Sequence, residues 1–139
     1  MNKTVWLLLL ICFGCAKKPG QSALKVQVVD SNTISITNIN NNLLANTRQD
    51  TIPNEQWQNI LPIFRMPGDT DMRDYVNALP GKYAIKNNTI VFTADTPFHK
   101  GKTYFARFYH FQDDSDIWAL LKGKWKQHTP QYRECTFTP

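Results

Sequence analysis

The feature that most constrains the fold is a pair of alternating segments, residues 82–86 and 89–93, joined by Asn87-Asn88. In each segment apolar and polar residues alternate with the period of two that turns one face of a β-strand toward a core. Asparagine tolerates the positive φ angles that a two-residue hairpin turn requires. The sequence therefore predicts a tight antiparallel β-hairpin at this point.

Similar alternation recurs along the domain and indicates further strands. The segments with this pattern are residues 24–29, 33–39, 60–66, 103–111 and 132–137. Pro62 cannot donate to a ladder, so its strand is expected at a sheet edge. With the hairpin, these segments amount to about seven short strands separated by turn residues. That arrangement predicts an all-β, antiparallel β-sandwich in a single domain.

Two short helices are expected between these strands. Residues 53–59 can form a helical turn that begins with Pro53, because proline is tolerated at a first helical position. A second short helix can begin at Ser115 or Asp116, either of which can cap it, and end before Gly123. Residues 67–80 contain prolines at both ends and are expected to form a loop.

The N-terminal segment predicts secretion and an anchor. Lys3 precedes an apolar run over residues 5–13, which is followed by Gly14 and Cys15. This is the layout of a signal peptide, and the run is far short of the ~20 residues that a spanning helix needs. It resembles the signal of bacterial lipoproteins, in which the cysteine after the cut carries the lipid, here Cys15. Cys12 stands where that signal usually has an aliphatic residue, and the alternative is an ordinary signal peptide with a coincidental cysteine.

This resemblance implies three parts to the chain. Residues 1–14 are the signal peptide, residues 15–23 are the lipidated cysteine and its tether, and residues 24–139 are the folded domain. The membrane is thus expected as a partner through the N-terminal lipid, without a cofactor. Ala16 is not the aspartate that is associated with inner-membrane retention, so the sorting rule implies the outer membrane of the cell envelope.

The charge of the chain gives no sign of nucleic-acid binding. The net charge is +5, but Lys3 leaves with the signal, and Lys17 and Lys18 belong to the tether. The remaining domain is close to electrically balanced, which differs from the basic footprint of a nucleic-acid-binding protein. We expect no nucleic-acid partner.

The segment from Gly81 to Tyr109 resembles the C-terminal half of bacterial Ig-like domains of the surface-layer-protein type. The residues that carry this resemblance are the strand 88–93 and the turn 96–104, Thr-Pro-Phe-His-Lys-Gly-Lys-Thr-Tyr, which leads into a long strand. The resemblance implies an Ig-like β-sandwich with a spacer, adhesive or accessory role. Independently, Tyr104 at the start of a long inner strand can bury its ring and return its hydroxyl to backbone a few residues upstream.

Few residues have the spacing that a metal site needs. The three histidines are His99, His110 and His128, and none has a second ligand at a useful spacing. Asp69, Asp71 and Asp74 have the oxygen density of a calcium loop but not its order, which favours a solvated loop. We expect no metal. Cys135 shares a strand face with Phe137, so it is expected in the core; if Cys15 carried no lipid, a disulfide between Cys15 and Cys135 would be possible.

The sequence contains no motif that predicts catalysis. It lacks a G-x-S-x-G elbow, and its only glutamates are Glu55 and Glu134. A carboxylate pair for glycoside cleavage depends on spatial separation, which sequence alone does not give. We expect a protein that is not an enzyme.

The aromatic residues of the longest predicted strand define a candidate ligand or partner face. If Tyr104, Ala106 and Phe108 face the core, the opposite face carries Phe105, Arg107, Tyr109 and Phe111. Trp118 and Trp125 lie in the segment that we expect to fold back over these residues. A covered cluster is one interpretation, and an exposed face for an envelope protein or a glycan is the other.

Overall fold

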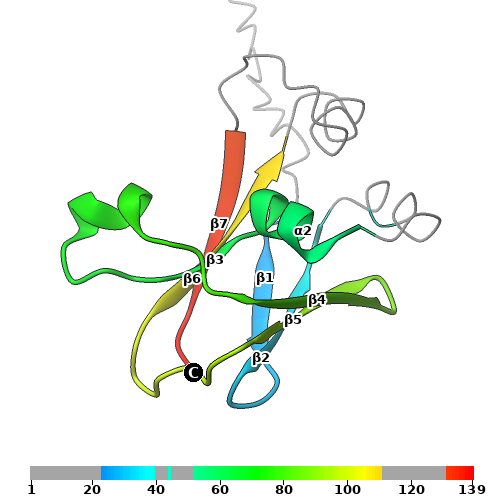
Figure 1. The fold of residues 1–139 in the computed structure, drawn as a ribbon, viewed down its shortest axis with the longest axis horizontal. Coiled ribbons are helices and arrows are strands. Elements are labelled where there is room, and N and C mark those ends of the chain that lie inside the picture. The colour runs from blue at the N-terminus through cyan, green and yellow to red at the C-terminus, as the bar shows by residue number, and fades with distance from the viewer. Residues whose placement is uncertain (1–22, 40–43, 45–51, 111–130) are drawn as a thin grey trace, which may run out of the picture.

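The computed structural model describes residues 23–39, 44, 52–110 and 131–139. Within these residues seven strands form two antiparallel sheets, and helices are few and short. Figure 1 shows the two sheets packed against each other with α2 beside them. The prediction of an antiparallel β-sandwich of about seven strands is confirmed at this level. Cys15, Phe111, Trp118 and Trp125 lie outside the described residues, as do the expected signal peptide and second helix.

The larger sheet has four strands in the order β1-β2-β5-β4. Its strands are β1 (Lys25–Val28), β2 (Thr33–Thr37), β4 (Gly81–Lys86) and β5 (Thr89–Ala94). The β4–β5 hairpin turns at Asn87 and Asn88, whose φ angles are 49° and 62°. The hairpin predicted from the sequence is therefore confirmed, and the two asparagines adopt the positive φ angles that such a turn requires.

The smaller sheet has three strands in the order β3-β6-β7. They are β3 (Ile63–Arg65), β6 (Tyr104–His110) and β7 (Gln131–Phe137). β3 follows Pro62 and pairs only with β6, so it is the edge strand that the proline predicted. β7 pairs with β6 and also lies beside β1 of the larger sheet. The two sheets therefore meet along β1 and β7.

The core lies between the two sheets and is built from alternating strand residues. Its fully buried members include Ile34 and Ile36 of β2, Phe92 of β5 and Phe108 of β6. These positions are the inward ones that the alternation predicted. Cys135 of β7 is partly buried and packs against the same cluster.

The helix α2 (Asn54–Ile60) follows Pro53 as expected. It buries Trp57 against Tyr83 of β4, with the ring centroids 5.9 Å apart. The Tyr83 hydroxyl donates to the Leu61 carbonyl at 2.7 Å, and burial raises the pKa of this phenol. The Asn54 Oδ1 accepts the backbone N–H of Tyr83 at 3.1 Å. These contacts attach α2 to β4, the edge strand of the larger sheet.

The segment expected to be a loop, residues 67–80, contains a 3₁₀ helix, η1 (Thr70–Tyr75). The Asp69 carboxylate accepts the backbone N–H of Asp71 at 3.0 Å and caps its start. After η1, the backbone N–H of Leu79 donates to the Ile63 carbonyl at 2.7 Å, so the returning chain reaches β3. The sequence missed this helix because its residues show no amphipathic period over so short a length.

Tyr104 is buried at the start of β6, and its hydroxyl accepts the backbone N–H of His99 at 2.9 Å. Its ring contacts Phe98 and Phe137, with centroids 5.0 Å and 5.6 Å away. The expectation that this hydroxyl returns to upstream backbone is confirmed. The bond joins the β5–β6 connection to the strand that follows it.

Candidate functional site

The outer face of the three-stranded sheet carries the three predicted face residues that the structure describes. Phe105, Arg107 and Tyr109 alternate with the core residues of β6, as the period of two requires. Each has a cross-strand partner, because the register pairs Phe105 with Phe64 of β3, Arg107 with Glu134 of β7, and Tyr109 with Tyr132 of β7. These six residues form what we call the arginine–aromatic face.

Arg107 occupies the centre of the arginine–aromatic face and has two acidic partners. Its Nε donates to Glu134 Oε1 at 2.6 Å, and its Nη2 donates to Asp74 Oδ1 at 2.7 Å. A third contact, from Nη1 to the Tyr109 hydroxyl, measures 3.5 Å and is weak. The Arg107 side chain is only 7% exposed, whereas that of Asp74 is 67% exposed. The Glu134 contact is therefore the better shielded of the two ion pairs.

Aromatic rings surround the Arg107 guanidinium. Its Cζ lies 4.3 Å from the centroid of the Tyr132 ring, 5.6 Å from that of Phe105 and 5.7 Å from that of Phe64. A guanidinium within about 6 Å of a ring centroid is attracted by the ring quadrupole. These contacts partly replace the water that burial removes from Arg107.

The hydrogen-bonding and acidic partners of Arg107 stabilise its charged form. Burial by itself lowers the pKa of Arg107. The hydrogen bonds to Tyr109, Asp74 and Glu134, together with the Coulombic attraction of the Glu134 carboxylate, outweigh burial and raise the pKa above its ordinary value. Because this guanidinium keeps its proton, it can hold negative charge in place but cannot act as a general acid.

The helix η1 supplies the remaining contacts. Arg73 lies over the Phe105 ring, with its Cζ 4.5 Å from the centroid, and its Nη2 is 2.6 Å from Glu134 Oε2. The two oxygens of Glu134 thus face one arginine each. Asp74, the next residue in η1, reaches Arg107. One turn of 3₁₀ helix therefore contributes one cation and one anion to the sheet face.

Phe105 is fully buried, although it lies on the outer side of the sheet. Its described neighbours include Phe64, stacked at 5.0 Å between centroids, and Arg73 above the ring. A covered cluster was one of the two interpretations of this face. The segment that we expected to cover it, residues 117–125, lies outside the described residues.

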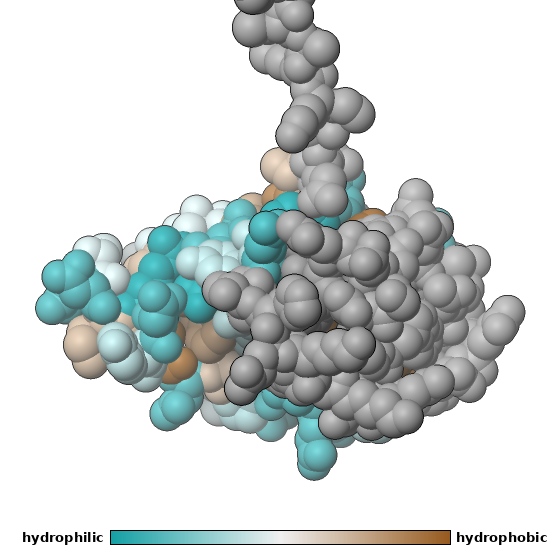
Figure 2. All heavy atoms as spheres, turned by 90° about the horizontal axis from the view of Figure 1, so that it is seen from above, coloured by the Kyte–Doolittle hydropathy of each residue, from teal (hydrophilic) through white to brown (hydrophobic). Residues whose placement is uncertain are grey.

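The accessible part of the arginine–aromatic face is its Tyr109–Tyr132 end. Tyr132 is 48% exposed and meets Tyr109 edge to face, with centroids 5.9 Å apart. On η1, Met72 and Tyr75 are also exposed large residues. Figure 2 shows the end of the molecule that carries η1, at the left, as mostly hydrophilic with smaller hydrophobic areas.

Sequence reasoning identified the strand residues of this face and missed three of their partners, Arg73, Asp74 and Glu134. The sequence did predict the orientation of Glu134. The alternation of β7 places Glu134 on the face of the strand that points away from Cys135 and Phe137. For Arg73 and Asp74 the sequence carried no signal. Asp69 caps η1 and Asp74 pairs with Arg107, so both of these aspartates have structural partners.

The described residues contain no group of three or more histidine, cysteine, aspartate or glutamate side chains that could hold a metal ion. Over the same ranges, no helix is long and apolar enough to cross a membrane. A shallow depression of about 590 Å³ lies beside Arg65 and Lys102, separate from the arginine–aromatic face. No family model, curated protein or solved structure matches the chain.

Proposed function

We propose that this chain is a lipid-anchored, Ig-like module of the bacterial cell envelope with a structural or protein-interaction role and no catalytic activity. The observation that carries the proposal of an interaction role is that the charged groups of the arginine–aromatic face are bonded to one another. Glu134 and Arg107 are engaged with each other, and Arg73 holds the second Glu134 oxygen at 2.6 Å. Groups held in this way stabilise a surface of fixed shape, which suits an interaction module.

The strand order supports the Ig-like part of the proposal. In a constant-type Ig domain with strands A to G, the sheets are ABED and CFG. The orders β1-β2-β5-β4 and β3-β6-β7 correspond to that scheme strand by strand. Tyr104 at the start of β6, bonded to the His99 backbone, corresponds to the tyrosine corner at the start of strand F.

The anchor is supported by the sequence of the N-terminal segment. An apolar run over residues 5–13 ends at Gly14-Cys15, and several acyl chains on Cys15 would hold the domain at a membrane essentially permanently. Ala16 favours the outer membrane. Residues 16–23 then serve as the tether to β1, which begins at Lys25.

A pair of cysteine variants tests the anchor. The full chain is expressed in a Gram-negative host, and its membrane and soluble fractions are compared after carbonate washing. We expect Cys15→Ala to leave the chain unprocessed, with its signal still attached, or to release it from the washed membrane fraction. The matched variant Cys12→Ala is expected to be processed and retained like the parent. Normal processing and retention of Cys15→Ala would overturn the anchor.

A glycan-binding accessory module is the second candidate, and the exposed Tyr132 ring favours it. Sugar rings pack on exposed aromatic side chains, and Tyr132 is held in place by Tyr109 and Arg107. Under this alternative the chain binds members of a saccharide array without turnover, and Tyr132→Ala abolishes the binding. Tyr75→Ala, which changes an exposed tyrosine outside the arginine–aromatic face, is the matched control.

A further inference from the structure

The outer face of the four-stranded sheet is hydroxyl-rich and basic. Its inward positions, such as Ile34, Ile36 and Phe92, are fully buried, so the alternate positions face outward. The outward strand residues are Lys25, Gln27, Thr33, Ser35, Thr37, Lys82, Ala84, Lys86, Thr89, Val91 and Thr93. We call this surface the lysine face. None of these strand residues is acidic, and the largest apolar one is a valine.

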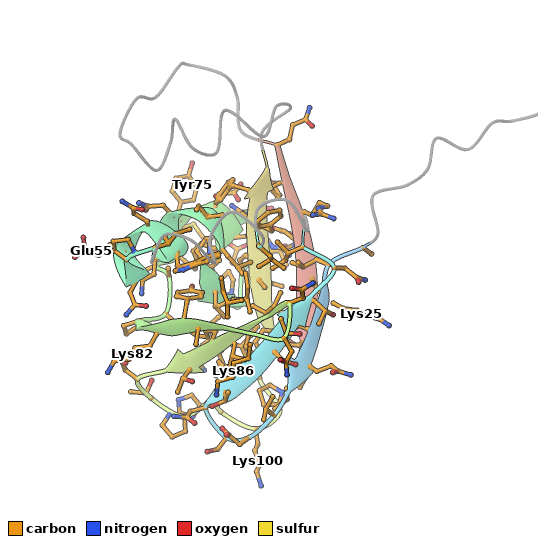
Figure 3. All side chains as sticks on the ribbon, turned by 90° about the vertical axis from the view of Figure 1, so that its right-hand side faces the viewer. Lys25, Glu55, Tyr75, Lys82, Lys86 and Lys100 are labelled. Atoms are coloured by element: carbon orange, nitrogen blue, oxygen red, sulfur yellow. The ribbon has the colours of Figure 1, made fainter. Side chains whose placement is uncertain are left out.

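The three lysines flank the sheet on both edges. Lys25 lies on β1, and Lys82 and Lys86 lie on β4, the opposite edge. All three are exposed, and Figure 3 shows Lys25 and Lys82 extending beyond opposite edges of the sheet. Between the edges, the central strands present mostly small hydroxyl side chains, which are shorter than the lysine side chains.

Two of the lysines lie on a single row across the sheet. Lys25 pairs with Thr37, and Lys86 pairs with Thr89. The β2–β5 register, extended by one pair, places Thr37 opposite Thr89. At about 4.8 Å per strand, the Lys25 and Lys86 backbones are thus separated by about 14 Å. That spacing suits contact with several headgroups of a lipid surface at once.

This row lies at the end of the sheet where the tether enters. The Asn38 Nδ2 donates to the Ala23 carbonyl at 3.0 Å and fixes the start of the domain beside the end of β2. The aspartates that flank the sheet strands, Asp30 and Asp95, lie at the opposite end, where the backbone N–H of Ala94 donates to the Asn32 carbonyl at 2.8 Å. The row nearest the tether therefore carries two lysines and no acidic residue, whereas Lys82, which pairs with Thr93, lies at the end that also carries the two aspartates.

We propose that the lysine face rests on an anionic phospholipid surface, with the row of Lys25 and Lys86 nearest the membrane. The inference rests on the proposed anchor at Cys15, because ten residues of extended chain from Cys15 to Lys25 span at most ~36 Å. A tether of this length allows the lysines to reach the headgroups. Each lysine near an anionic leaflet increases binding about fivefold, so the three together favour the face-down orientation about a hundredfold.

Lysine acetylation on vesicles tests this orientation. The purified full chain is incorporated into vesicles of phosphatidylcholine alone or with 30% phosphatidylglycerol, and acetylation rates are read by peptide mass spectrometry. We expect Lys25, Lys82 and Lys86 to react at least threefold more slowly on the anionic vesicles, and 0.5 M NaCl to remove the difference. Lys100, in the β5–β6 connection at the other end of the domain, is the matched internal control and should react equally on both.

Other results of the same experiment would overturn the lipid contact or the anchor. Equal acetylation rates of the three lysines on both kinds of vesicle would overturn the lipid contact, whether the rates were fast or slow. The same spectra give the mass of the N-terminal peptide. An acylated Cys15 with equal rates refutes the lysine face alone, whereas an unmodified Cys15 refutes the proposed anchor. A chain with an unmodified Cys15 that still carries residues 5–13 is held on the vesicles by this apolar run, so its lysine rates remain decisive.

Discussion

Arg107 and Glu134 lie directly opposite each other on β6 and β7, and the Arg107 Nε donates to Glu134 Oε1 at 2.6 Å. This cross-strand ion pair lies on the outer side of the sheet, yet neither side chain is more than 18% exposed. The shielding comes from neighbouring rings and from η1. A residue pair that alternation alone places on the surface is thus part of a buried charged cluster.

Breaking this pair is expected to destabilise the domain strongly. Glu134→Ala leaves Arg107 with only the exposed Asp74 as an acidic partner, and also removes the partner of Arg73. Removing one member of a largely buried pair costs about 3–5 kcal/mol, and the residual Asp74 contact places this variant near the lower limit. Urea denaturation measures the change in the free energy of unfolding.

Asp74→Ala is the matched control for that measurement. Asp74 contacts the same guanidinium but is 67% exposed, so its loss is expected to cost less than about 1 kcal/mol. Equal costs for the two variants would contradict the central position given to Glu134. In a double-mutant cycle with Arg107→Met, the coupling should be larger for Glu134 than for Asp74.

The Tyr104 corner predicts a graded pair of variants. Tyr104→Phe keeps the ring but leaves the His99 backbone N–H without its acceptor, at a cost of about 1–3 kcal/mol. Tyr104→Ser also removes the aromatic volume between Phe98 and Phe137, so it should cost more. Thermal unfolding followed by circular dichroism ranks them. A Tyr104→Phe domain as stable as the parent would show that the hydrogen bond contributes nothing.

Two glycines in the chain are expected to differ sharply in their tolerance of alanine. A Cβ at Gly81 would lie 2.5 Å from the Phe92 ring and 2.5 Å from the Thr93 carbonyl oxygen, so the β4–β5 ladder must shift. We expect Gly81→Ala to destabilise the domain by about 1–3 kcal/mol or more. Gly68→Ala, which meets nothing within 4 Å, should leave the urea midpoint unchanged. Equal midpoints for the two variants would refute this close packing.

The turn between β1 and β2 contributes to the stability of the fold in a way that depends on pH. The Asp30 carboxylate accepts the backbone N–H of Asn32 at 3.0 Å, which holds its pKa below the ordinary value of 3.8. A lowered folded-state pKa stabilises the fold above that ordinary value and stops doing so as the pH falls through the folded pKa. The stability difference between the parent and Asp30→Ala should therefore shrink as the pH falls from 6 toward 3. A difference that stays constant over that range would contradict the bond.

The hairpin and the Tyr104 corner were predictable because their signals are local. Asn87-Asn88 adjoins both strands that it joins, and Tyr104 reaches backbone only five residues upstream. The alternation of β6 likewise predicted which of its side chains face the core. These elements needed no knowledge of distant parts of the chain.

The cover of the arginine–aromatic face was not predictable. Asp74 precedes Arg107 by 33 residues, and η1 is too short to show a helical period. The aspartates of this segment look like a solvated loop until the fold brings the segment against β6 and β7. Tertiary contacts thus determine whether an outward aromatic is exposed or buried.

The mass of the N-terminal peptide of the mature protein tests the proposed lipid anchor most directly. The protein is extracted from washed membranes with detergent, digested and analysed by mass spectrometry. The account predicts that the chain begins at Cys15 and carries a diacylglyceryl group with or without a further acyl chain. A mature chain that begins elsewhere, or an unmodified Cys15, would contradict it.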